Sequence, residues 1–335
     1  MNMHIWLENL KNSKVKKAMP VLSFPSVSLL GITVKELIAN SDMQAKGMKA
    51  IADRVDSAAS LSMMDLSVEA EAFGSTIKFS DFEVPTVIGS IVNNEEDAEA
   101  LQIPAIGAGR TGEYISAIEK TCVMVTDRPI FAGVIGSFSL AGRLLDVSEA
   151  LVKCYTEPDC VHKTLEKTTD FLIQYIKAYK EAGANGVVLA EPLTGLLSPK
   201  MAVEFSEPYI KKIVESVQDD EFIVIYHNCG NNTIFMVDSI LNTGASAYHF
   251  GNSISMKEIL SKIPKNIVTM GNVDPSSQFC NGTPESITAE TKRIMSECCY
   301  EYPNFVISSG CDIPPTSKWE NIDAFFKAVS NFFQT

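Results

Sequence analysis

We predict an α/β fold, a (β/α)8 barrel of the TIM-barrel type, from three features of the sequence. Short apolar runs recur along the chain, a turn rich in Gly, Asn or Pro follows each run, and a helical pattern follows the turn. Runs that are apolar on both faces and alternate with helices are typical of a parallel sheet that helices cover. About eight such units over roughly 300 residues favour a barrel over a doubly wound sheet.

Six of the apolar runs are predicted strands. They cover residues 130–136, 186–190, 222–226, 247–250, 267–270 and 305–308. Two helix starts agree with this series, because Ser198-Pro199 and Thr283-Pro284 each place an N-cap residue before a proline at the first helical position. The strands and helices therefore alternate as a barrel requires.

The first third of the chain is less regular than the rest. Residues 69–80 are expected to form a small β excursion outside the barrel, and the first twenty residues are polar, Lys-rich and mildly amphipathic. We expect one barrel domain over residues 1–335, with a helical extension at its N-terminus.

Composition restricts the class of partner and the compartment. The 335 residues include 28 Lys and Arg against 41 Asp and Glu, a formal charge of −13. This balance argues against nucleic acid or an anionic membrane as partner, because both would repel it. No apolar run reaches the about 18–20 residues that span a bilayer, and no signal-peptide core is visible. Eight cysteines are too sparse for a secreted disulfide framework. We expect a cytoplasmic protein.

Chemically reactive residues follow three of the predicted strands. They lie at residues 227–230, 271–274 and 309–312. Because the C-terminal ends of parallel barrel strands meet at one rim, we expect these segments to lie close together.

His227, Cys229 and Cys311 are candidate metal ligands. Residues two apart on an extended chain share a face, so His227 and Cys229 can reach one ion, and Cys311 offers a thiolate from a distant strand. Three protein ligands with an open fourth position are typical of catalytic zinc, and thiolates favour zinc over magnesium or calcium. Two thiolates and a neutral imidazole leave the site formally neutral, so that an incoming thiol binds as a nucleophilic thiolate. The spacing alone is also compatible with ordinary strand-end residues that bind nothing.

Six segments carry a family resemblance that spans nearly the whole chain. They are residues 65–74, 133–141, 197–209, 227–229, 271–275 and 309–314. On these segments the sequence resembles the uroporphyrinogen decarboxylase superfamily, and within it the zinc-dependent methylcobamide:coenzyme M methyltransferases. The resemblance implies a (β/α)8 barrel with zinc held by His227, Cys229 and Cys311. It also implies methyl transfer from a methylated corrinoid (methylcobamide), carried by a corrinoid protein partner, to a small thiol such as coenzyme M.

The same resemblance includes uroporphyrinogen decarboxylase itself, the enzyme of porphyrin biosynthesis. Its substrate bears eight carboxylates, and the enzyme uses an Arg-rich N-terminal loop, since a guanidinium pairs with a carboxylate bidentately. The corresponding residues 17–26 contain no arginine, and the first in the chain is Arg54. We therefore favour the methyltransferase. Two more functions stay open, a corrinoid methyltransferase with a different donor or acceptor, such as tetrahydrofolate, and a non-catalytic zinc or corrinoid binding module.

Three further rim residues are candidate catalytic groups. Glu191 ends a strand and is expected either to support the metal site, including as a temporary fourth ligand, or to lie as a carboxylate at a helix N-terminus. Asp65, with Glu69, falls in a family segment and is expected to face the cavity. His249 is expected either to line the corrinoid approach or to be a hydrogen-bonded rim residue.

Asn272 and Asp274 are candidate cofactor-binding residues. They could instead order a loop, with Asp274 as a cap and Pro275 fixing the turn. Asp312 is expected to hydrogen-bond a metal ligand. Tyr226 is expected to point away from the metal, because side chains alternate along a strand.

Overall fold

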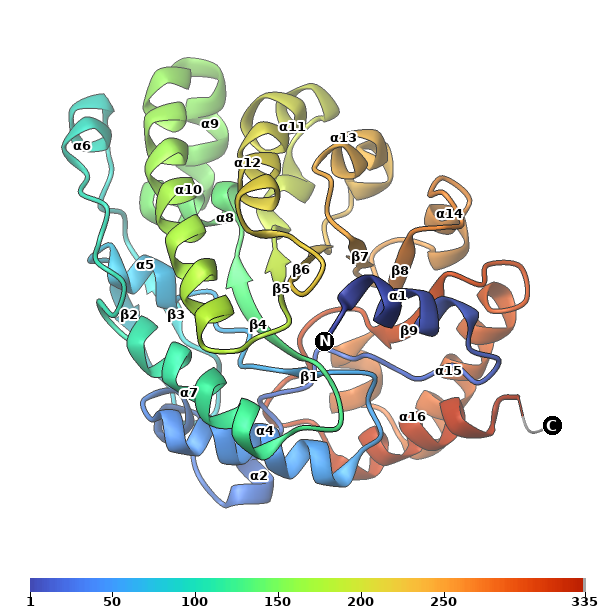
Figure 1. The fold of residues 1–335 in the computed structure, drawn as a ribbon. Coiled ribbons are helices and arrows are strands. Elements are labelled where there is room, and N and C mark those ends of the chain that lie inside the picture. Colours follow the sequence, from blue (N-terminus) through green and yellow to red (C-terminus); the bar gives the residue numbers. More distant parts are fainter. Residues whose placement is uncertain (334–335) are drawn as a thin grey trace.

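The computed structural model describes residues 1–333 and has the predicted barrel architecture, a curled parallel sheet surrounded by helices (Figure 1). The sheet has the strand order β1-β4-β5-β6-β7-β8-β9, and each neighbouring pair is parallel. Its strands are β1 (Ser60–Leu61), β4 (Ile130–Ile135), β5 (Gly186–Ala190), β6 (Ile223–Asn228), β7 (Ala247–Phe250), β8 (Val268–Val273) and β9 (Phe305–Ser309).

Residues 18–21, here called the closing segment, join the two edges of this sheet. On one side Met19 N donates to Ile307 O of β9 at 3.0 Å, and on the other Ala58 N donates to Ala18 O at 2.8 Å just before β1. Val21 N also donates to Ser309 Oγ at 2.9 Å. The closing segment thus takes the eighth strand position, and the sheet becomes a barrel.

Helices form the outer layer. Those that pack around the barrel between consecutive strand positions are α4 (Ser41–Arg54), α7 (Thr111–Met124), α10 (Pro158–Glu181), α12 (Glu207–Val217), α13 (Val237–Asn242), α14 (Met256–Leu260), α15 (Pro284–Cys298) and α16 (Trp319–Asn331). Additional short elements are α1 (Met3–Asn12), α2 (Ser26–Leu30), α3 (Val34–Ile38), α5 (Val68–Ala72), α6 (Glu95–Ala100), α8 (Ser137–Leu145), α9 (Val147–Thr156), η1 (Pro192–Leu196), α11 (Pro199–Phe205), η2 (Thr233–Phe235) and the π-helix η3 (Pro275–Cys280). Among residues 1–333, no helix combines the length and the apolar character needed to cross a membrane.

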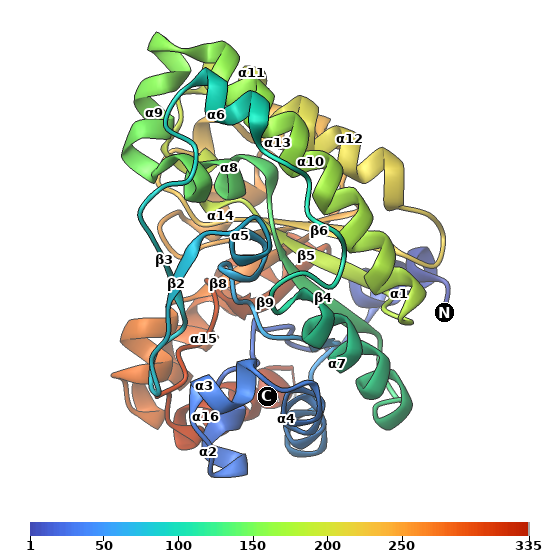
Figure 2. The same ribbon diagram turned by 90° about the vertical axis from the view of Figure 1, so that its left-hand side faces the viewer.

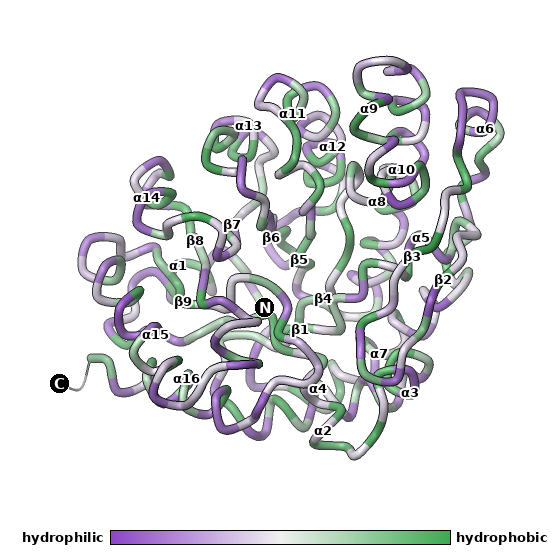
Figure 3. Tube along the Cα trace, turned by 180° about the vertical axis from the view of Figure 1, so that it is seen from behind, coloured by the Kyte–Doolittle hydropathy of each residue, from purple (hydrophilic) through white to green (hydrophobic). Residues whose placement is uncertain are grey.

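The apolar core has two layers, one inside the barrel and one between the strands and the outer helices. Inside the barrel, Phe131, Ile223 and Met270 are buried, and α1 covers the end where the strands begin, with the Trp6 ring 5.5 Å from the Phe131 ring. Figure 2 shows α1 and the hairpin of β2 (Thr76–Lys78) and β3 (Thr86–Ile88) on opposite sides of the barrel. The Cα trace is hydrophobic along β4 and hydrophilic around the peripheral α6 (Figure 3).

The six strands predicted from the apolar runs are all present, with shifted ends for some. β6 runs through Asn228 and β8 through Val273, so His227 and Asn272 lie within strands rather than after them. The β excursion predicted for residues 69–80 is present only in part. The chain is helical in α5 and forms a strand only in β2. That strand pairs antiparallel with β3.

Candidate metal centre

His227, Cys229 and Cys311 come together at the rim where the strands end. Their ligand atoms all lie within 4.8 Å of one another, and His227 Nε2 is 3.7 Å from Cys311 Sγ. His227 is held by β6, Cys229 directly follows it, and Cys311 follows β9. The imidazole is buried, whereas both cysteines are partly exposed. One nitrogen and two sulfurs at this spacing can hold a metal ion and leave a side open to solvent.

The two thiols are linked to each other electrostatically. The thiol of Cys311 donates a hydrogen bond to Cys229, which lowers the pKa of Cys229. The same contact, together with burial, raises the pKa of Cys311 to about 12. A soft divalent cation that replaces these protons suits this donor set, because thiolate sulfur and imidazole nitrogen are ligands that zinc prefers.

Two glycines allow the chain to pack closely beside the two cysteines. A Cβ added to Gly251 would lie 2.4 Å from Cys229 Cβ, and one added to Gly310 would lie 2.5 Å from Asn252 Oδ1. Real Cβ atoms do not approach so closely, so only glycine fits at these positions without moving the chain segments beside Cys229 and Cys311.

Glu191 is fully buried and hydrogen-bonded to the start of α8. Its Oε2 accepts from Phe138 N at 3.1 Å and its Oε1 from Ser139 N at 2.6 Å. Burial raises the pKa of Glu191 to about 7. Gly136 makes this approach possible, because a Cβ there would lie 2.3 Å from Glu191 Oε2. The structure therefore places Glu191 as a carboxylate at a helix N-terminus.

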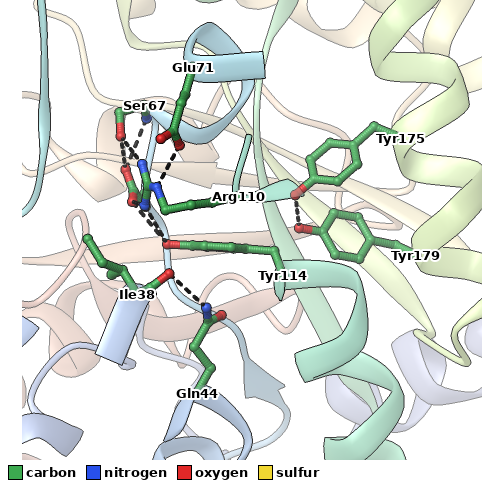
Figure 4. Close-up of polar contacts among 9 residues, drawn as sticks. Ile38, Gln44, Ser67, Glu71, Arg110, Tyr114, Tyr175 and Tyr179 are labelled. Carbon is green, nitrogen blue, oxygen red and sulfur yellow. Dashed lines mark hydrogen bonds and ion pairs between the residues drawn. The ribbon is translucent and has the colours of Figure 1, made fainter. Parts of the chain in front are cut away.

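Asp65 lies in a buried network with Arg110. Arg110 Nη1 is 2.5 Å from Asp65 Oδ2, and Arg110 Nε is 2.6 Å from Glu71 Oε2. The Tyr114 hydroxyl donates to Asp65 Oδ2 at 2.9 Å, and the Ser67 hydroxyl donates to Asp65 Oδ1 at 2.6 Å. Figure 4 shows Arg110 between Glu71 and Ser67, with the Tyr114 ring alongside. The carboxylate of Asp65 is thus engaged by protein donors.

The remaining predicted rim residues organise loops around the centre. Asn272 donates to Gly251 O at 3.0 Å and to Ile254 O at 2.9 Å. Asp274 accepts from Ser276 N at 2.9 Å and from Ser277 N at 3.0 Å, and so caps η3. The structure places both residues in loop-ordering roles.

Three other predicted residues are placed as follows. His249 is buried, and its Nδ1 lies 2.7 Å from His227 Nδ1, as in the alternative of a hydrogen-bonded residue. Asp312 Oδ1 is buried without a hydrogen-bond partner among the described residues, and burial raises the pKa of Asp312 well above its ordinary value. Tyr226 turns away from the centre, as predicted, and its hydroxyl accepts from Asn228 Nδ2 at 3.2 Å.

Comparison with known proteins places this barrel in a family. The model of the family described as uroporphyrinogen decarboxylase (URO-D) matches residues 17–332. The chain belongs to the URO-D family. The resemblance inferred from the sequence is thereby confirmed.

Relatives of this URO-D protein include methylcobamide:CoM methyltransferases and uroporphyrinogen decarboxylases. It is 27% identical over 274 residues to the methylcobamide:CoM methyltransferase MtbA of Methanosarcina mazei, covering 80% of this chain and 78% of the relative. The protein of the same name from Methanosarcina acetivorans is 28% identical over 273 residues, with the same coverage. Uroporphyrinogen decarboxylase of Coxiella burnetii is 26% identical over 269 residues, covering 75% of this chain and 72% of the relative.

Solved structures share the fold of this URO-D protein. A methyltransferase from Methanosarcina mazei superposes with a TM-score of 0.87 at 24% identity, covering 99% of both chains. A B12-independent methionine synthase from Shewanella reaches a TM-score of 0.64 at 11% identity, covering 95% of both chains.

Sequence reasoning missed several residues of this URO-D protein that contact the candidate site residues. Gly251 packs on Cys229 and Ser308 contacts His249, whereas Arg110 and Tyr114 bind Asp65. Gly251 directly follows a predicted strand, and Ser308 ends one, so the strand-end position was the available signal for both. Arg110 and Tyr114 lie one helical turn apart, yet no pattern indicates that they face Asp65.

The buried carboxyl group of Glu69 should make the stability of this URO-D protein depend on pH. Its Oε1 accepts from Ile135 N at 3.1 Å, and its Oε2 is buried without a partner among the described residues. Burial raises the pKa of Glu69 from 4.5 to about 8. The folded state therefore holds this proton more tightly than the unfolded state. Stability from this group is complete below about pH 4.5 and is lost as the pH rises towards 8.

The variant Glu69→Gln keeps an oxygen for Ile135 N and removes the ionisation. We expect it to match the wild type near pH 5. By pH 8 we expect it to be more stable by at least about 1.4 kcal/mol, the equivalent of one pKa unit. Urea unfolding at pH 5, 6.5 and 8 measures the trend, and Glu96→Gln on an exposed helix face is the control. A difference that stays constant with pH contradicts the prediction.

Proposed function

We propose that this URO-D protein is a zinc-dependent methyltransferase that moves a methyl group from a methylated corrinoid, carried by a partner protein, to a small thiol. The observation that carries the proposal is the rim cluster of one imidazole nitrogen and two thiols within 4.8 Å. The names of its MtbA relatives support a methylcobamide donor and a thiol acceptor. Coenzyme M is the acceptor that those names suggest.

The chain's own residues would supply binding and charge balance. His227, Cys229 and Cys311 would hold the ion, and their partly exposed thiol side leaves room for the sulfur of a substrate. Bound zinc would supply Lewis acidity that lowers the pKa of the substrate thiol. The overall reaction forms an S–CH3 bond, breaks the Co–CH3 bond and releases the thiol proton. Orientation of the two substrates at one rim would provide the remaining rate enhancement.

Uroporphyrinogen decarboxylation is less well supported. Residues 17–26 lack arginine, and the closing segment within them is buried between β9 and β1 rather than free to bind a carboxylate. Arg110, beside Asp65, is already paired with two carboxylates. A substrate with eight carboxylates would meet few free cations near these residues.

The direct test is an assay with free methylcobalamin. Zinc-loaded protein is mixed with methylcobalamin and a panel of thiols, and the Co–CH3 absorbance is followed; tetrahydrofolate is tested in parallel. We expect loss of absorbance with a thiol, no loss after chelation, and recovery when zinc is restored. Loss only with tetrahydrofolate would establish a folate as the acceptor instead. No loss with any acceptor, with free methylcobalamin and with methylated corrinoid protein, would overturn the proposal.

A further inference from the structure

A line of hydrogen bonds runs from the metal centre to the closing segment. His227 Nδ1 is 2.7 Å from His249 Nδ1, His249 Nε2 is 2.7 Å from Ser308 Oγ, and the Ser308 hydroxyl donates to Met19 O at 2.7 Å. The three side chains are at most 3% exposed. Bulk water therefore does not compete for these contacts.

The last acceptor determines where the protons lie. A backbone carbonyl only accepts, so the single hydroxyl proton of Ser308 is directed to Met19 O. Ser308 Oγ can then only accept from His249 Nε2, which must carry a proton. If the Ser308 hydroxyl instead donated to His249 Nε2, the Met19 carbonyl would lose the hydrogen-bond donor that it has in the structure.

His249 is neutral in this environment. Its ring is buried, and the groups that hydrogen-bond to it, the side chains of His227 and Ser308 and the backbone of Ser309, carry no negative charge. A buried cation without a counter-charge is costly. A neutral imidazole protonated on Nε2 has an unprotonated Nδ1. The proton in the short contact between the two rings therefore belongs to His227 Nδ1.

This assignment leaves one nitrogen of His227 without a proton. His227 Nε2 faces the cysteine thiols, 3.7 Å from Cys311 Sγ. An imidazole nitrogen must be unprotonated to bind a metal, and the hydrogen bond of the other nitrogen decides which one is free.

We propose that His249 and Ser308 are positioning residues that hold His227 with its proton on Nδ1 and its Nε2 free for the metal. The Met19 carbonyl sets the direction of the line. The inference rests on the proposed function in one respect, that His227 binds the metal. Partner groups of a ligand histidine are usually carboxylates, carbonyls or water, whereas in this structure a second, buried histidine takes that place.

The first test reads the proton positions directly. The chain has four histidines, so two-bond ¹H–¹⁵N correlation spectra of histidine-labelled, metal-free protein can be assigned by single substitutions. We expect His227 to be protonated on Nδ1 and His249 on Nε2. A His227 protonated on Nε2 would overturn the inference, whatever the enzyme activity.

The second test measures the zinc dissociation constant by competition with a chelator. His249→Leu removes the acceptor for His227 Nδ1, and Ser308→Ala removes the side-chain acceptor for His249 Nε2. We expect each to weaken zinc binding by about 10–100-fold, as is usual when the support of a ligand is lost. His249→Asn keeps an acceptor oxygen close to the position of Nδ1, and we expect it to recover most of the affinity lost in His249→Leu.

His162→Asn is the matched control. His162 lies in α10, where its Nδ1 contacts the Tyr209 hydroxyl at 2.7 Å. The same type of substitution there should leave the zinc affinity unchanged. Circular dichroism establishes that each variant is folded, and if His249→Leu does not fold, Ser308→Ala and the spectra decide the question.

The outcomes separate this inference from the proposed function. Zinc affinity that is unchanged in both His249→Leu and Ser308→Ala, or an equal loss in His249→Asn and His249→Leu, would overturn the line of hydrogen bonds. A protein that binds zinc with the expected proton positions but transfers no methyl group would overturn the proposed function and leave the line intact.

Discussion

Cys311→Ala is expected to remove bound zinc and to abolish methylation of the thiol substrate. Cys311 provides one of the three ligand atoms. The other two come from His227 in β6 and from Cys229, which directly follows β6. A metal held by two ligands alone loses more affinity than the about 10–100-fold that follows loss of a supporting hydrogen bond. Zinc content per chain, measured by atomic emission, and the methylcobalamin assay report the two effects.

A second cysteine provides the control for this prediction. Cys280 ends η3 and is also partly exposed, and its Sγ is 3.5 Å from Thr316 Oγ1, outside the metal centre. Cys280→Ala should retain zinc and activity. Because Cys311 is partly exposed, its alanine variant should still fold, so loss of zinc would report on ligation. Full zinc content and full activity in Cys311→Ala would contradict the assignment of the ligand.

Arg110→Ala is expected to lower the free energy of unfolding by about 3–5 kcal/mol, because it leaves the buried carboxylate of Asp65 without its partner. The side chain of Asp65 is 0% exposed and that of Arg110 is 10% exposed. Arg110 also donates to the Ser67 hydroxyl at 2.8 Å, and its guanidinium lies 5.1 Å from the Phe79 ring next to β2. Its planar group thus joins several acceptors that a single alanine releases at once. Unfolding in guanidinium chloride at pH 7 measures the loss.

Arg293→Ala is the matched control for this substitution. Arg293 pairs with Glu290 and Glu297 on α15, but its side chain is 53% exposed. Exposed ion pairs contribute about 0–1 kcal/mol, so the control should change stability little. Asp65→Asn combined with Arg110→Ala should recover part of the loss, since the unpaired charge is then absent. Equal costs for Arg110→Ala and Arg293→Ala would contradict the prediction.

The strands were predictable because each carries its own signal. β4 and β5 are apolar on both faces, and this pattern is enough to place them in a buried parallel sheet. The closing segment has no such signal: Pro20 interrupts it, and its strand position is created by β9 and β1 on either side. The closing segment becomes a strand position only by pairing with β9 and the start of β1. A local sequence pattern does not indicate pairing with segments so distant in sequence.

The candidate site likewise has residues that a local sequence pattern predicts and residues that it does not. His227 and Cys229 could be paired from the alternation along one strand, whereas Cys311 was joined to them only by its position after another strand, and the family resemblance then supported the set. Arg110 lies 45 positions from Asp65, and their contact depends on a side-chain conformation that no spacing indicates. For His249 the sequence left open a residue lining the corrinoid approach or a hydrogen-bonded rim residue, and its register on β7 beside His227 brings it into hydrogen-bonding distance of that ring.

The closing segment has a consequence for how the protein is made. Its contact with β9 joins Val21 to Ser309, 288 positions apart. At about 5–20 residues per second, synthesis of the intervening chain takes on the order of 15–60 s. During that interval the closing segment has no β9 to pair with, and the nascent chain exposes an unpaired strand edge of the kind that promotes aggregation. Since Cys311 follows Ser309 in the chain, the complete metal centre can form only after synthesis has passed both residues.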